Sequence, residues 1–383
     1  MDEELFDIIL QHGMMYPEME PVDYVKLLYQ NEFGTTYFID KPFNRLESLR
    51  EEFHSLSANA KGGGREFYVE PIGSSLCRIF LTPGEEMQQF LPLLNLLCSA
   101  TSNLHLGSRV RFGQKLELLQ KIAQDGLIGV GQDQMKSFLD EYIRSGCGSV
   151  HHSRKYKKAY DPHYRVVKTS YYVYLPVFRA AMKLLETHGG KEPVILALDG
   201  RCGSGKSFLA DLLKEVFGCS VFHMDDFYLP IQNRHSDWML RPAENIDRAR
   251  FLREVLVPLK RGESVQYRPY SCQKGEMLPP REVQPGKIAV VEGSYSLYPE
   301  FRKFYDYRLF LTCSPNVQQR RIFLRGNGSR LHDFLKTWIP LEEQYISTMN
   351  VMDVCDLILD TSNITNSTCG KSFRLSMASY YSA

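Results

Sequence analysis

A glycine-rich segment at residues 200–207 constrains this chain more than any other feature of its sequence. The segment reads Gly200-Arg201-Cys202-Gly203-Ser204-Gly205-Lys206-Ser207 and matches the pattern G-x-x-x-x-G-K-[ST] at every fixed position. The apolar run VILALD precedes it, and a helical pattern with apolar residues on one side follows it. This strand–loop–helix context is the one that the motif requires, and it argues against an ordinary glycine-rich turn.

The chemistry of this loop follows from its residue types. Glycines let successive backbone N–H groups converge on phosphate oxygens, and the N-terminus of the following helix adds the positive end of its dipole. Lys206 is placed to reach the terminal phosphates, and Ser207 to bind magnesium. We therefore expect residues 200–207 to bind ATP together with Mg²⁺.

The second half of the chain predicts an α/β fold. At 383 residues the chain is long enough for two domains, and the segment 188–193, which contains Gly189-Gly190, marks the expected boundary. Beyond it, short apolar runs alternate with helical stretches, at 194–199, 220–224, 287–292, 307–312 and 356–359. This alternation predicts a parallel sheet covered by helices on both faces.

The first half has a different pattern. Residues 66–82 predict two short strands around a Pro/Gly break, and 171–186 predicts a connecting helix. Further helical patterns lie at 85–99, 111–123 and 132–144. We expect a mostly helical α+β domain over 1–190, the P-loop domain over 191–362, and a loose serine- and threonine-rich tail over 363–383.

Charge and composition exclude several protein classes. Forty-six basic and forty-five acidic residues give a net charge of +1, which offers no bulk electrostatic argument for a nucleic-acid or membrane-surface binder. No apolar run approaches the roughly 20 residues that span a bilayer, and the acidic start MDEELFDIIL is unlike a secretory signal. The nine cysteines show no CxxC spacing, which argues against a zinc cage or a disulfide framework. We expect a cytoplasmic protein, and a homo-oligomer stays open.

Two acidic motifs lie at the ends of predicted strands. The block His223 to Tyr228 (HMDDFY) follows the second apolar run, and Glu292 ends the run IAVVE. Because the carboxyl ends of parallel strands meet at one edge of a sheet, we expect Asp225 and Glu292 to lie beside the phosphate loop. A carboxylate there can accept a hydroxyl proton or bind the metal. On spacing alone, the Asp225-Asp226 pair fits a helix N-cap and its neighbour equally well.

Taken in order, these segments resemble the uridine kinase family and its relatives, pantothenate kinase and phosphoribulokinase. The matching features are GRCGSGKS, DDFY, Asn245-Ile246-Asp247, Tyr267-Arg268-Pro269-Tyr270, VVEGSY and Arg320-Arg321-Ile322-Phe323-Leu324-Arg325. The resemblance extends over residues 192–362, under half of the chain, and implies a P-loop kinase fold there. The first half resembles no family of known function.

The resemblance implies roles for single residues. Lys206 would stabilise the transferred phosphoryl group, and Asp225 would accept the proton of the acceptor hydroxyl. The implied magnesium ligands are Ser207, Asp225 and Glu292. Arg321 and Arg325 resemble lid arginines that close over the phosphates, for which a solvated basic helix face is the alternative.

Implied substrate-binding residues are Asp226, Tyr228, Asp247 and Tyr270. Among them Asp247 resembles the acid that contacts ribose hydroxyls, and Tyr270 resembles a wall of the acceptor pocket. Uridine or another nucleoside is the first candidate acceptor. Departures from the family pattern at Ser271, 326–330 and 338–342 leave pantothenate-like compounds and sugar alcohols open.

Two other functions fit the same loop. A P-loop regulator or ATPase could signal nucleotide state to the first half, but the sequence contains neither N-K-x-D nor LSGGQ, so the familiar switch and transporter versions lose support. A kinase for nucleic acids would use the basic stretch 151–168 to dock its substrate. The balanced net charge weighs against it.

The stretch 151–168 (HHSRKYKKAYDPHYRVVK) is the most basic and tyrosine-rich part of the chain. It could contact a phosphate or a nucleotide, since basic side chains gather around anions and tyrosines stack on bases. We favour a loop that packs its tyrosines on the neighbouring domain, because tyrosine combines an apolar body with a polar tip. A metal site of His151, His152 and His163 lacks a carboxylate or cysteine pair at a familiar spacing.

Overall fold

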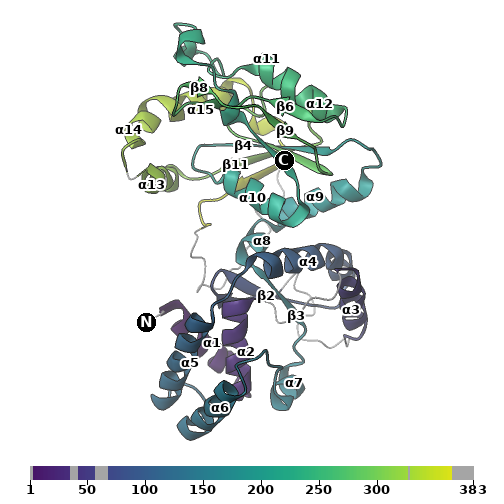
Figure 1. Ribbon diagram of the computed structural model, residues 1–383, viewed down its shortest axis with the longest axis vertical. Helices are drawn as coiled ribbons and strands as arrows, with labels where there is room; N and C mark the ends of the chain where they lie inside the picture. Colours follow the sequence, from purple (N-terminus) through teal and green to yellow (C-terminus); the bar gives the residue numbers. More distant parts are fainter. Residues whose placement is uncertain (1–2, 35–41, 57–67, 327, 365–383) are drawn as a thin grey trace. The chain divides into compact units, whose positions relative to one another are not determined.

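The computed structural model describes residues 3–34, 42–56, 68–326 and 328–364. The chain divides into two compact units between Leu175 and Pro176 (Figure 1). Apart from residues 363 and 364, the tail predicted over 363–383 lies outside the described residues.

The first unit is a mostly helical α+β structure, as predicted. Its helices are α1 (Glu3–Met15), α2 (Pro21–Phe33), α3 (Pro42–His54), α4 (Glu85–Leu104), α5 (Arg109–Gln124), α6 (Gln132–Arg144), α7 (Arg154–Tyr160) and α8 (Thr169–Val173). Its strands β1 (Val69–Gly73), β2 (Leu76–Phe80) and β3 (Tyr164–Lys168) form one antiparallel sheet with β2 in the middle. The strands β1 and β2 and the helices α4, α5 and α6 lie where the sequence predicts them.

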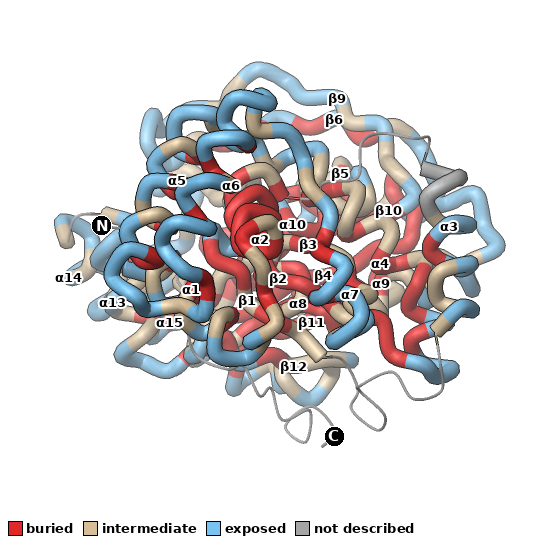
Figure 2. Tube along the Cα trace, turned by 90° about the horizontal axis from the view of Figure 1, so that it is seen from below, coloured by how far each residue is buried: buried red, intermediate tan, exposed pale blue. Residues whose placement is uncertain are grey.

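Helix α2 is the buried centre of this unit, and Figure 2 shows it buried along most of its length. One side of it packs against α5 and α6, where Tyr24 and Leu28 join Phe112 and Leu119 in a single apolar cluster. The same helix also buries polar side chains, among them Asp23. A helix that is buried nearly all round must satisfy such groups by internal hydrogen bonds.

The basic stretch 151–168 is not a loop. It forms α7 and the third strand β3, and Tyr156 and Tyr164 are buried in the core of the first unit itself. The interpretation that these tyrosines pack on the neighbouring domain is therefore wrong for both. The three histidines do not converge on one point: His152 contacts Asp23, and His163 contacts Glu52, whereas His151 is exposed.

The second unit contains a five-stranded parallel sheet, which confirms the predicted α/β fold. Its strands β4 (Val194–Gly200), β5 (Ser220–His223), β10 (Ile288–Glu292), β11 (Tyr307–Thr312) and β12 (Leu357–Asp360) follow the order β12-β11-β4-β10-β5. The helices that matter for the site are α9 (Leu175–Thr187), α10 (Lys206–Phe217), α11 (Arg248–Phe251), α12 (Val257–Lys260), α13 (Pro315–Gly326), α14 (Leu331–Asp333) and α15 (Ile339–Thr348). Short two-stranded pairs, β6 (Val265–Tyr267) with β9 (Arg281–Val283) and β7 (Tyr270–Ser271) with β8 (Glu276–Met277), flank them.

Helices cover the parallel sheet on both faces, with α9 and α10 on one side and α11 and α12 on the other (Figure 1). The central strands β4 (VILALDG) and β10 (IAVVE) are buried along their whole length, because the middle of such a parallel sheet exposes neither face. Helix α9, predicted as a connector, belongs to this unit, and Phe178 packs 6.1 Å from the ring of Phe217 at the end of α10. The unit boundary thus precedes the glycine-rich segment 188–193. Among the described helices, none has the length and apolar character needed to cross a bilayer.

Candidate functional site

Three segments that are far apart in the sequence meet at the carboxyl edge of the parallel sheet. Strand β4 ends at Gly200, β10 at Glu292 and β5 at His223. Glu292 is in register with Leu198 of β4 on one side and with His223 on the other. The glycine-rich loop therefore starts beside the acid that ends β10, at the edge where ligands of such sheets bind.

The loop depends on glycine at its first position. Gly200 has φ +146°, and a Cβ there would lie 2.2 Å from the carbonyl oxygen of Leu311, so any side chain would displace β11. Gly205 has φ +100° and is the N-cap of α10. Helix α10 then begins at Lys206. The free backbone N–H groups of its first turn therefore point into the loop.

The side chain of Lys206 folds back over the loop. Its ammonium donates to the carbonyl oxygens of Gly200 at 2.7 Å and Arg201 at 3.1 Å, and to the Ser294 hydroxyl at 3.4 Å. These are neutral acceptors without a carboxylate among them. Among the described residues, the ammonium of Lys206 thus forms no ion pair, although its charge acts on the carboxylates of Asp199 and Asp225.

Glu292 joins the loop to the strand β5. Its carboxylate is buried and accepts hydrogen bonds from the Ser207 hydroxyl at 3.2 Å and from His223 Nδ1 at 2.5 Å. The hydrogen bond with Glu292 raises the pKa of His223 above its ordinary value. Nothing in the sequence marks His223 except its place two residues before Asp225.

Asp225 differs from its neighbours because its carboxylate has no hydrogen bond or ion pair with any residue that the structure describes. Solvent reaches it, but dense protein surroundings raise its pKa, and the charge of Glu292 adds to this effect. The adjacent Asp226 is held by the Tyr267 hydroxyl and by Arg281, both at 3.2 Å. Neither carboxylate caps the short turn η1 (Met224–Phe227), so the N-cap reading of this pair does not apply.

The arrangement suits a magnesium ion. Burial and the charge of Glu292 raise the pKa of Asp225, and the Ser207 hydroxyl lies at the same place. A divalent cation bound there would lower the electrostatic cost of keeping Asp225 ionised. The described residues contain no cluster of three or more His, Cys, Asp or Glu that could hold a metal. Mg²⁺ commonly uses one or two carboxylates plus substrate phosphates, so the small ligand set is compatible with it.

Two glutamates on α15 hold the phosphate loop, and sequence reasoning missed both. Buried Glu342 accepts from the backbone N–H of Cys202 at 2.8 Å and from the Ser294 hydroxyl at 2.6 Å. Glu343 binds the Arg201 guanidinium through both oxygens, at 2.6 and 2.9 Å. These contacts direct the side chain of Arg201 and the N–H of Cys202 to α15, so the two groups support the loop from outside.

The two predicted lid arginines lie in different surroundings. The guanidinium of Arg321 donates to the Gly203 carbonyl at 3.2 Å, to both oxygens of Thr361, and to the Ile364 carbonyl at 2.6 Å. Arg321 therefore ties α13 to the loop. Arg325 is exposed and lies over the Phe334 ring at 5.7 Å, which leaves its charge available to a ligand.

An aromatic cluster lies next to the DDFY block. The half-buried Trp338 has its ring 6.1 Å from Tyr228 and 5.9 Å from Trp238, and Arg234 covers the Trp238 ring at 4.6 Å. Tyr228 is the one predicted substrate-binding residue in this cluster. Both tryptophans of the chain take part, although no spacing in the sequence connects them.

The other predicted substrate-binding residues have structural partners. Asp247 is the N-cap of α11 and accepts from the backbone N–H of Arg250 at 3.1 Å and from its Nε at 3.3 Å. Tyr270 is buried on β7.

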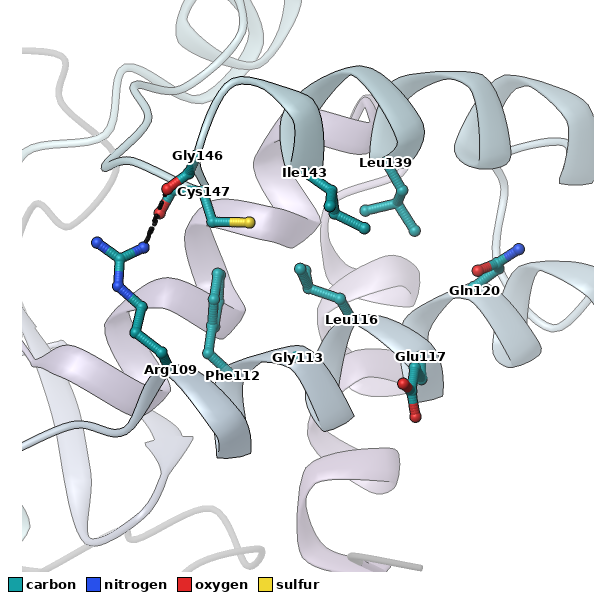
Figure 3. Close-up of a pocket in the computed structure, with 10 residues that line it drawn as sticks. All are labelled: Arg109, Phe112, Gly113, Leu116, Glu117, Gln120, Leu139, Ile143, Gly146 and Cys147. Atoms are coloured by element: carbon teal, nitrogen blue, oxygen red, sulfur yellow. Dashed lines mark hydrogen bonds between the residues drawn. The ribbon is translucent and has the colours of Figure 1, made fainter.

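A separate groove of about 440 Å³ lies between α5 and α6 of the first unit (Figure 3). Its lining is mainly apolar, with Phe112, Leu116 and Ile143 as the large contributors, and Arg109 closes one end by donating to the carbonyl oxygens of Gly146 and Cys147. No group of catalytic side chains converges on it in the part of the chain that the structure describes.

Comparisons with known proteins find kinases that are similar to part of the chain. No model of a known protein family matches the chain. It is 31% identical over 149 residues to phosphoribulokinase from Synechocystis sp., and the match covers 37% of this chain and 44% of that protein, so the chain spans less than half the length of this curated relative. Among solved structures, a possible uridine kinase from Bacillus stearothermophilus is 20% identical with a TM-score of 0.39, covering 49% of this chain and 100% of that one. Phosphoribulokinase from Rhodobacter spheroides is 12% identical with a TM-score of 0.33, covering 45% and 71%.

Proposed function

We propose that this chain, part of which has the P-loop kinase fold of uridine kinase and phosphoribulokinase, is an ATP-dependent kinase that phosphorylates a hydroxyl group of a small molecule. One observation carries the proposal: Asp225 is a carboxylate without a partner among the described residues, at the edge where the phosphate loop and Glu292 meet. A simple nucleotide-binding loop needs no such base.

The phosphate loop would bind the triphosphate through the backbone N–H groups at the start of α10. Lys206 would exchange its three neutral acceptors for phosphate oxygens, since it forms no ion pair among the described residues. The Ser207 hydroxyl, Glu292 and Asp225 would hold Mg²⁺, which when bound spreads the negative charge of the phosphates. Arg325 would add positive charge from α13.

Asp225 would remove the proton from the attacking hydroxyl. A raised pKa makes its ionised carboxylate a better proton acceptor than an ordinary aspartate. As the hydroxyl oxygen forms its bond to the γ-phosphorus, the bond from that phosphorus to the bridging oxygen breaks, and ADP leaves with the electron pair. The proton stays on Asp225 until solvent takes it.

A nucleoside, uridine first, is the acceptor that the aromatic cluster favours. Tyr228, Trp238 and Trp338 offer flat faces on which a base can stack, close to the DDFY block that carries Asp225. Pantothenate-like compounds and sugar alcohols lack a base and would gain less from these rings. The aromatic cluster supports a nucleoside, and uridine comes first because the sequence resembles the uridine kinase family.

The test is ATP consumption by the purified protein with magnesium, measured against a panel of nucleosides, vitamins and sugar alcohols. One acceptor should accelerate consumption, and Lys206→Ala should abolish the acceleration because the γ-phosphate loses its cation. A flat panel with clear ATP binding would favour the regulator or ATPase instead. Acceleration by a sugar alcohol alone would keep the kinase and overturn the nucleoside.

A further inference from the structure

The side chain of His223 contacts the proposed metal site, yet the kinase proposal gives it no part. His223 ends β5 and is in register with Glu292, which ends β10. Neighbouring strands of a sheet lie about 4.8 Å apart, and residues in register on parallel strands direct their side chains to the same face. The two side chains therefore meet where both strands end, beside the phosphate loop.

Glu292 receives two hydrogen bonds on a single oxygen. Nδ1 of His223 lies 2.5 Å from Oε1, and the Ser207 hydroxyl donates to the same atom at 3.2 Å. The second oxygen, Oε2, has no hydrogen bond with any residue that the structure describes. The carboxylate is thus held through Oε1, and Oε2 is left for a cation.

The contact does not depend on the charge of the imidazole. A carboxylate oxygen only accepts hydrogen bonds, so the shared proton belongs to Nδ1, and both the imidazolium and one neutral tautomer supply it. Nε2 of His223 has no hydrogen bond within the described part of the chain, and the side chain is 40% exposed, so water can solvate this side of the ring in either form. His223 can therefore hold Glu292 whether or not its ring is charged.

The position of Glu292 decides how Ser207 can bind a metal ion. A hydroxyl that donates its proton to Glu292 keeps both lone pairs of its oxygen for other partners. Magnesium requires oxygen ligands in a near-octahedral arrangement at about 2.0–2.1 Å and tolerates little displacement. If the carboxylate rotated, Ser207 would lose its acceptor and the orientation of its lone pairs.

Two roles of His223 agree with these contacts. Glu292 is 5% exposed, and a buried carboxylate needs donors, so His223 could serve only to stabilise the folded edge of the sheet. Alternatively, the contact sets the geometry of a ligand site. The exposed Asp225 favours the second role, because solvent reaches it and the charges of Glu292 and His223 both act on its carboxylate. The edge is therefore open where a metal ion would bind.

We propose that His223 is a positioning residue for the metal ion: it fixes the Glu292 carboxylate so that Oε2 and the Ser207 hydroxyl oxygen both stay available to Mg²⁺. The inference rests on the proposed kinase function, because that function requires the ion. Hydrogen-bond partners of metal ligands control affinity in this way, and their loss commonly costs about 10- to 100-fold. His223 acts through Glu292 and not on the reacting atoms.

The experiment measures nucleotide binding without turnover. Isothermal titration calorimetry on the full chain gives the affinity for AMP-PNP, an ATP analogue that resists hydrolysis, in EDTA and at a series of Mg²⁺ concentrations. His223→Leu removes the donor, and His223→Asn has the same branched shape but offers an amide N–H close to the place of Nδ1–H. Tyr267→Phe is the matched control, since it removes a hydroxyl donor from the adjacent Asp226.

The variants should differ only when magnesium is present. We expect His223→Leu to need about tenfold more Mg²⁺ than the unmodified protein for the same gain in AMP-PNP affinity. Its affinity in EDTA should not change, because the phosphate loop itself is untouched. His223→Asn should restore the Mg²⁺ dependence, and Tyr267→Phe should leave it as in the unmodified protein.

Other outcomes would overturn the positioning role. An unchanged Mg²⁺ dependence in His223→Leu would show that Glu292 needs no such donor, and the kinase proposal would still stand. An equal loss of AMP-PNP affinity in EDTA would show that His223 only stabilises the fold of this edge. Normal Mg²⁺ binding in His223→Asn without recovery of acceptor-dependent ATP consumption would mean that the ring contacts the reacting groups. An unmodified protein whose AMP-PNP affinity ignores Mg²⁺ would contradict the proposed function itself, and this inference with it.

Discussion

The two units use their ionisable side chains differently. At the edge of the parallel sheet, the Asp225 carboxylate has no hydrogen bond or ion pair among the described residues, and the charge of Glu292 helps to raise its pKa. In the first unit the ionisable groups form a buried polar network, in which Arg78 binds Gln30 and Glu70, Glu70 also contacts His12, and His152 lies between Asp23 and Tyr164. The difference teaches that charged groups stabilise the first unit from inside, whereas the second unit keeps one carboxylate available to a ligand.

Replacing the unpaired carboxylate should have the largest effect. Asp225→Asn keeps the shape of the side chain but removes the proton acceptor, and kcat should fall by about 10³-fold while ATP still binds. The matched control is Asp226→Asn, whose carboxylate is held by Tyr267 and Arg281 and which should lose far less kcat. Single-turnover kinetics with the accelerating acceptor measure the step. Near-normal turnover in Asp225→Asn would show that the unpaired carboxylate is not the base.

Removing one carboxylate from the buried polar network of the first unit should lower the free energy of unfolding and leave kcat unchanged. Glu70→Gln leaves Arg78 without its counter-ion in a buried site, which should lower the free energy of unfolding by about 3 kcal/mol. Both tryptophans of the chain, Trp238 and Trp338, belong to the second unit. The loss should therefore appear as an earlier transition in far-UV circular dichroism without an earlier transition in tryptophan fluorescence. A fluorescence transition that moves equally would mean that the two units unfold together.

The pH dependence of the first unit sharpens the comparison further. The folded pKa of His152 is about 4, below the ordinary value of about 6.5, so the folded state prefers neutral His152. This contribution is complete above pH 6.5 and is lost as the pH falls from there toward 4. Between pH 7 and pH 5 the loss should be about 2 kcal/mol, measured by urea unfolding followed by circular dichroism. A His152→Gln variant should not show this part of the loss, and an unchanged pH profile would contradict the buried neutral imidazole.

The sequence predicts more of the second unit than of the first, because the important residues of the second unit lie in short contiguous segments. The parallel strands of the second unit were predicted to within one or two residues, because strands buried on both faces are short apolar runs. The phosphate loop is one contiguous motif, and chain order alone brought Glu292 beside it. Strand β3 was missed, because a basic segment hides the alternation of buried Tyr164 and Val166.

The polar network of the first unit could not be predicted in this way. Its members come from α1, α2, β1, β2 and the segment before α7, and no spacing along the chain connects them. Arginine is seldom fully buried, so nothing in the sequence marks Arg78 as the centre of a core. The glutamates of α15 pose the same problem, because their partners Arg201 and Cys202 lie about 140 residues earlier.

Replacing Glu342, one of these two glutamates, should have the smallest effect of the four substitutions. Glu342→Gln can keep one acceptor oxygen for the Cys202 N–H, but its amide then faces the Ser294 hydroxyl in place of a carboxylate oxygen. The loss of one such buried contact, about 1 kcal/mol, should loosen the loop and raise KM for ATP by about fivefold with little change in kcat. Glu343→Gln, whose pair with Arg201 is partly exposed, should change KM less, and it serves as the control. If Glu342→Gln lowered kcat without changing KM, α15 would act on the transferred phosphoryl group and not on the loop that binds the nucleotide.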